Sequence, residues 1–384
     1  MTNRQFSPEF LNREWESRAD RATDDQHAST FVALTWNLQA DKMRYPKDAV
    51  RGINGLRPGE DNSAMVDCLR ALFGQGECIG LSEYADIVML QELQQCSRHV
   101  KRGDCRHHTQ YKKCNYDHAA WVDATFKQEG YLGGYHNRRW NTCGLYFRPD
   151  VWENITDLRS PPSQTKLLFI TFDGYKANGS SAVGAATREE LELHSDKNAV
   201  LAVLMHRVTG QKVLAISTHL SVPKDLTGAF NTTRQMAELA QLGSKIENVI
   251  THHGPMHILI GGDMNCVDRH ISDAAPPNVF LRLTQEWGLS SSYTSVGGIG
   301  FPAYSSLNAN FRHCIDHMVS SPDLIPRSVL TVRPELVSAV PGADTPYPSD
   351  HLPLATEYLL FNSGTFSSSS SNTAGSTING NIYR

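Results

Sequence analysis

A pattern that recurs along this 384-residue chain constrains its fold more than any other feature: short apolar segments end in a carboxylate, a carboxamide or an imidazole. Short apolar runs bounded by polar residues are typical of buried β-strands. Polar groups at strand ends converge on one edge of a sheet, where α/β folds place their active sites. The pattern occurs six times, at residues 34–37, 88–92, 215–219, 258–265, 314–319 and 348–351. One such segment is a common strand end or turn, but six in one chain favour a catalytic site.

Helical patterns lie between the apolar segments, and this alternation indicates a layered α/β domain. Apolar residues at helical spacing predict helices over residues 64–72 and 233–249. Strands are expected at residues 31–36, 86–90, 144–147, 199–205, 212–217 and 257–260.

We expect a catalytic domain over residues 29–362, preceded by a polar extension and followed by a flexible tail. In the extension, residues 1–28, Ser7 followed by Pro8 predicts the start of a short helix that docks on the domain. Residues 363–384 contain five consecutive serines and too little apolar surface to become ordered.

Composition narrows the setting in which this chain works. With 36 basic and 40 acidic residues, the net charge of −4 argues against binding nucleic acid through bulk charge. No apolar run approaches about 18 residues, so we expect no membrane contact. The first residues show no secretion signal, so we expect an intracellular protein, cytoplasmic or nuclear. Its eight cysteines are then expected to be reduced thiols.

The polar strand ends resemble, in order and identity, the motifs of the endonuclease/exonuclease/phosphatase superfamily. They extend from residue 37 to residue 351, which is most of the chain. This resemblance implies a DNase I-like fold, a four-layer α/β sandwich of two mixed β-sheets flanked by helices. The residues that carry it are Asn37, Glu92, His219, Asp263, Asn265, Asp316, His317 and Ser349 to His351.

Further motifs are similar to those of the deadenylase branch, which includes nocturnin, the Angel proteins and the carbon-catabolite-repressor deadenylases. Residues 347–354 resemble the closing motif of that branch, and the stretch from Arg312 resembles nocturnin. Two departures matter: Asn141-Thr142 replaces an Asp-Gly pair, and Ser221 replaces a lysine of nocturnin-like sequences that is suited to an extra phosphate. Inositol-phosphatase signatures and a leucine-rich adaptor domain are absent from the sequence.

The resemblance implies that the enzyme uses Mg²⁺, for which Mn²⁺ is a possible substitute. A hard divalent cation neutralises the charge of a phosphodiester, and carboxylates are its preferred ligands. The implied ligands are Glu92, Asn37 and Asp350.

The resemblance also implies direct in-line attack by water, without a covalent intermediate. Asp263 is the implied base, Asn265 holds the water or phosphate, and Asp316 orients and charges the imidazole of His351. His219 and His351 are the implied donors to the phosphate. The expected substrate-binding residues are Arg312, Asn141, Asn198 and Lys224.

A basic insertion is predicted over residues 94–129, directly after Glu92. Residues 98–113 contain six Lys or Arg and one acid, with Tyr and His interleaved. Such a segment suits single-stranded nucleic acid, although a solvated loop remains an equal interpretation. Cys96, Cys105 and Cys114 lack the tight pair typical of zinc sites, so zinc is a minor alternative.

These features predict a Mg²⁺-dependent phosphodiesterase, a 3′–5′ exoribonuclease of the poly(A) deadenylase type, with RNA or a nucleotide as its substrate. One alternative is a nucleotide phosphatase or 2′-phosphodiesterase acting on NADP(H) or 2′,5′-oligoadenylate. Another is a catalytically dead RNA-binding scaffold, which the altered pair at residues 141–142 leaves open. The sequence identifies no protein partner.

Overall fold

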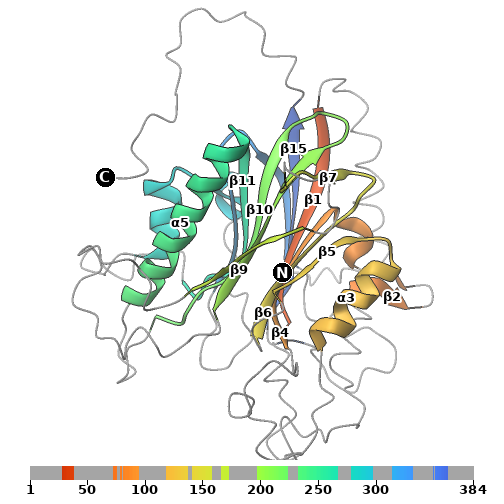
Figure 1. Cartoon of the computed structure of the whole chain (residues 1–384), viewed down its shortest axis with the longest axis horizontal. Helices are drawn as coiled ribbons and strands as arrows, with labels where there is room; N and C mark the ends of the chain where they lie inside the picture. The colour runs from red at the N-terminus through yellow and green to blue at the C-terminus, as the bar shows by residue number, and fades with distance from the viewer. Residues whose placement is uncertain are drawn as a thin grey trace, which may run out of the picture.

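Two β-sheets pack face to face, and helices cover their outer faces (Figure 1). The structure is a computed structural model. It describes residues 28–38, 72–75, 78–79, 81–94, 118–136, 141–157, 166–172, 197–223, 232–266, 278–296, 314–331, 349 and 351–361.

The first sheet has six strands. Its central strand pair, β1 (Ala28–Asn37) and β4 (Ile87–Gln94), is parallel, and the other pairings are antiparallel. Across the sheet the order is β14 (Ile325–Thr331), β15 (Leu354–Phe361), β1, β4, β6 (Asn141–Phe147) and β5 (Leu132–Tyr135).

The second sheet has seven strands and is also mixed. Its parallel pair is β10 (Lys212–His219) and β11 (His257–Asp263). The order is β12 (Ser290–Ser291), β13 (Asp316–Ser320), β11, β10, β9 (Asn198–His206) and β7 (Trp152–Asn154), with β8 (Leu168–Thr171) also paired to β9. A small separate hairpin joins β2 (Gly74–Gln75) and β3 (Cys78–Ile79).

Side-chain alternation along the strands builds the layers. In β1, Phe31 and Ala33 face the second sheet, whereas Val32, Leu34 and Trp36 face the helix layer on the other side. The helix on that side is α3 (His118–Gln128), and α5 (Thr233–His253) covers the outer face of the second sheet. The shorter helical segments are η3 (Leu81–Tyr84), α6 (Val279–Leu281), η4 (Arg282–Glu286) and α7 (Ser292–Ser295).

This arrangement confirms the predicted sandwich of two mixed sheets with flanking helices. Each of the six predicted strands is present and extends beyond its predicted bounds, and the predicted helix at 233–249 is α5. Of the basic insertion at 94–129, the structure describes residue 94 and residues 118–129, which include α3, whereas the basic stretch 98–113 lies outside the described residues. The N-terminal extension to residue 27, the tail from residue 362 and most of the helix predicted at 64–72 lie outside the described residues.

The structure describes the side chains of three of the eight cysteines. Cys143, Cys266 and Cys314 are buried and in the reduced form, as expected for cysteines beside the polar strand ends. Cys96, Cys105 and Cys114 lie outside the described residues. Among the described helices, none is long and apolar enough to cross a membrane.

Candidate active site

Parallel pairing in both sheets brings the candidate catalytic residues to one edge of the sandwich. In the first sheet, Asn37 pairs with Gln91, so that Glu92 follows directly beside the end of β1. In the second sheet, His219 pairs with Asp263 at the ends of β10 and β11. Because parallel strands end at the same edge, four polar side chains that are far apart in the sequence meet there.

Glu92 has an unusual backbone conformation. Its φ of 57° lies in the left-handed region, and a bulge interrupts the pairing of β4 with β6 between Leu90 and Leu93. Such strain costs on the order of 1–3 kcal/mol and concentrates at functional sites, where a bulge re-aims a side chain. Here the carboxylate is almost fully buried, with Oε1 3.7 Å from Nε2 of His219. The bulge and this backbone conformation thus direct the Glu92 carboxylate toward His219.

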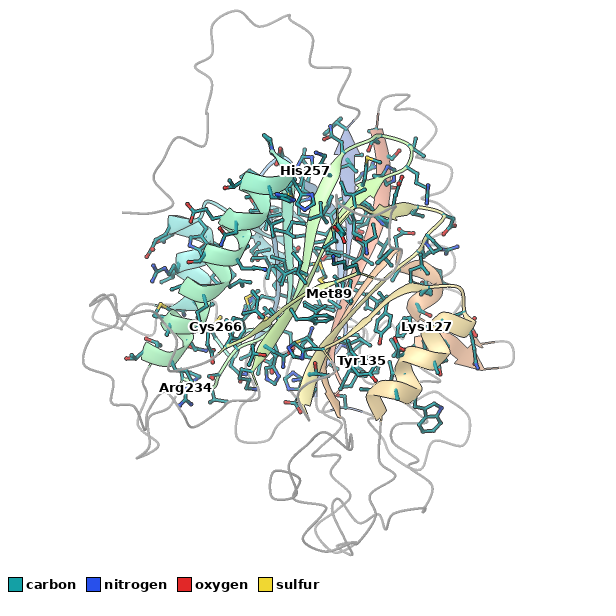
Figure 2. All side chains as sticks on the ribbon, viewed as in Figure 1. Met89, Lys127, Tyr135, Arg234, His257 and Cys266 are labelled. Carbon is teal, nitrogen blue, oxygen red and sulfur yellow. The ribbon has the colours of Figure 1, made fainter. Side chains whose placement is uncertain are left out.

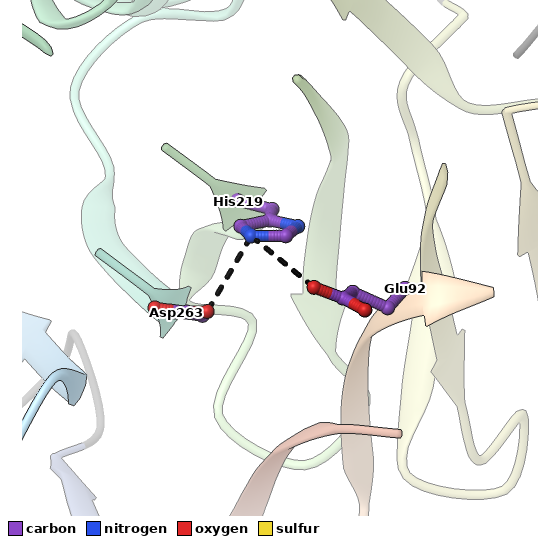
Figure 3. Close-up of side chains that lie close together, drawn as sticks. All are labelled: Glu92, His219 and Asp263. Carbon is purple, nitrogen blue, oxygen red and sulfur yellow. Dashed lines mark ion pairs between the residues drawn. The ribbon is translucent and has the colours of Figure 1, made fainter. Parts of the chain in front are cut away.

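Asp263 is the centre of the site. Its Oδ2 accepts a hydrogen bond of 2.9 Å from Nδ2 of Asn37 and lies 3.4 Å from Nε2 of His219. Figure 3 shows His219 between the carboxylates of Glu92 and Asp263, each contributed by a different sheet. Burial raises the pKa of the Asp263 carboxyl to about 6, while His351 nearby opposes the shift. A cation beside this carboxylate would keep it ionised.

His351 is oriented by a carboxylate. Its Nδ1 lies 2.8 Å from Oδ2 of Asp316, and its Nε2 faces Asp263 Oδ2 at 4.0 Å. Asp316 is paired directly with Asp263 across β13 and β11. The backbone of His351 is held by Trp36, whose Nε1 donates to its carbonyl at 2.9 Å. The predicted Asp316–His351 pair is therefore formed.

Asn265 turns the chain after β11. It has a φ of 47°, its N–H donates to Oδ1 of Asp263 at 2.9 Å, and its Nδ2 donates to the carbonyl of Leu220 at 2.9 Å. From α5, Nε2 of Gln235 donates to the carbonyls of Ser221, Met264 and Asn265. These bonds join the segments that follow β10 and β11, so the start of α5 braces both.

Lys197 is a functional candidate to which the sequence motifs assigned no role. It is 7% exposed, and its Nζ contacts Nε2 of His219. Its positive charge also acts to lower the pKa of Asp263. A lysine directly before an apolar strand is a common pattern, so only its burial beside an imidazole distinguishes it.

The predicted substrate-binding residues have different outcomes. Asn198 is buried, and its Oδ1 accepts a 2.9 Å hydrogen bond from the backbone N–H of Cys143, which ties β9 to β6. The backbone of Asn141 begins β6, but its side chain is outside the described residues. Three further candidates lie outside the described residues: Arg312, Lys224 and the metal-ligand candidate Asp350. Substrate contact by these residues stays a prediction.

Ser221 points into the protein. It is fully buried, its N–H donates to Oε2 of Glu238 at 2.8 Å, and its hydroxyl donates to Oε1. Burial raises the pKa of Glu238 to about 7. The side chain at this position is thus engaged in a hydrogen bond inside the protein.

The donor set suits a hard divalent cation. Ligand atoms of Glu92, His219 and Asp263 lie within 4.8 Å of one another, and Asp263, Asp316 and His351 form a second such group. Carboxylates buried this close together repel one another unless a cation compensates their charge. Glu92, with Asn37 in the neighbouring strand, is therefore placed to hold such a cation next to Asp263.

Comparison with known proteins identifies a matching family. The model of the Endonuclease/Exonuclease/phosphatase family matches residues 34–351. No curated protein matches the sequence at a significant level.

Solved structures share the fold at low identity. The human nocturnin catalytic domain with bound sulfate is 18% identical, with a TM-score of 0.50, 87% of this chain covered and 97% of the other. A Bacteroides vulgatus endonuclease/exonuclease/phosphatase is 16% identical, with a TM-score of 0.51 and coverages of 87% and 99%. A mannosyl-6-phosphatase of Bacteroides thetaiotaomicron is 14% identical, with a TM-score of 0.51 and coverages of 86% and 100%. At these identities the likeness concerns the fold alone.

Proposed function

Because this chain belongs to the endonuclease/exonuclease/phosphatase family, whose members hydrolyse phosphodiesters or phosphate monoesters, we propose that it is a Mg²⁺-dependent phosphodiesterase acting on RNA from the 3′ end. The observation that carries this proposal is the convergence of Asn37, Glu92, His219 and Asp263 on one edge of the sandwich. The set combines what phosphoryl transfer to water needs: cation ligands, a base and donors.

A bound divalent cation would neutralise the phosphate and polarise one of its oxygens. Glu92 would hold this cation, with Asn37 beside it. Asp263 accepts a proton from the attacking water as a new P–O bond forms, and the bond to the leaving oxygen breaks on the opposite side. Asn265 holds the water in line with that bond.

The two imidazoles of the site bind the phosphate. His219 and His351 donate hydrogen bonds to its non-bridging oxygens as negative charge grows there. Asp316, 2.8 Å from Nδ1 of His351, holds this ring so that Nε2 points into the site. Nε2 of His351 lies 4.0 Å from Oδ2 of Asp263, so the proposed donor and the proposed base are neighbours in the site.

Two observations support RNA as the substrate. The closing motif at 347–354 resembles that of the deadenylase branch. The burial of Ser221 against Glu238 leaves no cation at this position for an additional phosphate, which disfavours NADP(H).

The experiment is a substrate panel with the purified full chain and Mg²⁺. The panel contains labelled poly(A) RNA, mixed-sequence RNA, abasic DNA, 2′,5′-oligoadenylate and NADPH. We expect shortening of RNA from the 3′ end. Cleavage of abasic DNA alone, or release of phosphate from NADPH alone, would contradict the RNA assignment, and inactivity on every substrate would favour a scaffold.

Variants link the activity to the site. Asp263→Ala, Glu92→Ala and His351→Ala should each abolish hydrolysis while circular dichroism shows an intact fold. Full metal-dependent activity in one of them would remove that residue from the scheme. Chelation by EDTA should stop hydrolysis by the unmodified protein, and Mg²⁺ or Mn²⁺ should restore it.

A further inference from the structure

The row of side chains at the catalytic edge continues beyond the residues described so far. In the second sheet, His219 pairs with Asn198, and Asn198 pairs with Thr171 at the end of β8. Neighbouring strands are about 4.8 Å apart, so Thr171 lies roughly 10 Å from His219 along the same edge.

The first sheet extends in the same direction. Beyond β4 and β6 lies β5, and His136, which follows this strand, donates its N–H to the carbonyl of Cys143. His136 and Thr171 then meet across the two sheets, with His136 Nε2 3.1 Å from Thr171 Oγ1. Tyr135, the residue before His136, lies at the same end of the sandwich as Arg234 and Cys266, whereas His257 lies at the opposite end (Figure 2). The outer strands of both sheets therefore contribute to the catalytic edge.

Phe169 provides an exposed aromatic surface next to this part of the edge. It lies two residues before Thr171 and so on the same face of β8, while Leu168 and Ile170 pack on the other face with the core beneath α5. Its ring contacts that of His136 with centroids 5.0 Å apart and planes at 71°. Although this contact anchors the ring, the side chain is still 44% exposed. A large exposed aromatic held by a buried histidine is suited to stacking on another flat ring.

We propose that Phe169, supported by His136 and Thr171, forms a subsite for a nucleotide that flanks the scissile phosphate. The base of this nucleotide stacks on the ring of Phe169. This inference rests on the proposed function, because it takes the substrate from the RNA assignment. Phe169 lies two residues, about 7 Å, back from Thr171 along β8, so a base that reaches its ring extends from the phosphate at the edge onto this face of the strand. His136 is a positioning residue that holds the ring.

The test measures binding and hydrolysis separately, using the full chain. The probes are three fluorescein-labelled five-nucleotide adenylate RNAs: one intact, one with an abasic 3′-terminal residue and one with an abasic penultimate residue. Fluorescence anisotropy with Mg²⁺ gives the Kd in the Asp263→Asn background, where cleavage does not interfere. Hydrolysis of the intact probe is measured with Asp263 present.

Stacking on an aromatic ring makes a large, base-dependent contribution, so Phe169→Ala should weaken binding of the intact probe by about 10- to 100-fold. For one of the abasic probes the same substitution should have little effect, because the stacked base is already missing. Phe169→Tyr should retain affinity, and Phe169→Leu should behave like alanine. Ile325→Ala is the matched control, since Ile325 is 41% exposed in β14 at the other end of the sandwich.

If Phe169→Ala lowers the affinity for all three probes equally, or does not lower it, the proposed subsite is overturned. If Phe169-dependent binding is found but the protein with Asp263 cleaves nothing, the proposed function fails while the subsite stands. If cleavage is normal and Phe169→Ala does not distinguish the probes, the subsite fails while the proposed function stands.

Discussion

Asn37 donates a hydrogen bond of 2.9 Å from Nδ2 to Oδ2 of Asp263, and this bond joins the two sheets at the catalytic edge. Asn37 ends β1 of the first sheet, and Asp263 ends β11 of the second. Both side chains are buried, so the bond forms where water does not compete with it. It fixes the orientation of the carboxylate that we propose as the base.

Asn37 should therefore be indispensable for rate. Asn37→Ala removes the donor to Asp263, and Asn37→Asp places a second carboxylate there, so each is expected to lower kcat by about 100-fold or more. Steady-state kinetics with an RNA substrate would measure the loss, and thermal unfolding would show whether the fold persists. A near-normal kcat in Asn37→Ala would show that Asp263 does not need this partner.

Lys197 should act through His219. Because Lys197 is buried against the imidazole, Lys197→Met is expected to reduce kcat by about 10- to 100-fold while KM changes little. Lys127→Met is the control, since Lys127 is an exposed lysine paired with Asp123 within α3. A rise in KM at unchanged kcat would instead indicate that Lys197 binds substrate directly.

Gly262 should not tolerate a side chain. A Cβ at this position would lie 1.9 Å from the backbone oxygen of Thr218, which is paired with Gly262 in the adjacent strand. Gly262→Ala should therefore separate β10 from β11, destabilise the protein by about 1–3 kcal/mol and displace Asp263, with loss of activity. Gly134→Ala, where the nearest atom is 3.7 Å away, should be tolerated in a parallel urea titration.

The stability of the protein should depend on the ionisation of Asp86. This residue directly precedes β4, whereas the candidate metal ligand Glu92 lies near the other end of that strand. Burial raises its pKa from 3.8 to about 6, although its carboxylate accepts a 2.8 Å hydrogen bond from the N–H of Val32. A raised folded-state pKa means that the unfolded chain loses this proton first as the pH rises. The contribution of Asp86 to stability is therefore lost as the pH rises through the window from about 4 to about 6.

Asp86→Asn keeps an acceptor for Val32 but removes the ionisation. Between about pH 3.5 and pH 7, its free energy of unfolding should rise relative to that of the unmodified protein by on the order of 2–3 kcal/mol. Urea unfolding at both pH values measures this difference. A constant difference between the two proteins would show that Asp86 has an ordinary pKa.

Much of the candidate site was predictable because its residues follow apolar strands directly. Asn37, His219 and Asp263 end strands whose apolar runs are evident from the sequence, and the Asp316–His351 pair followed from the family resemblance. Lys197 and Phe169 were not predictable in this way. Lys197 matters because of what it contacts, and Phe169 because it is exposed, and neither property is encoded in the neighbouring residues.

The sequence by itself determined the layered α/β class, the strand identities and the residue types available for catalysis, because apolar periodicity and strand-end chemistry are local properties. Only the tertiary structure decided which of these residues meet. The left-handed conformation of Glu92, the inward turn of Ser221 and the meeting of His136 with Thr171 each depend on pairing between segments far apart in the chain. Such pairing is set by the packing of both sheets, which residues adjacent in sequence cannot specify.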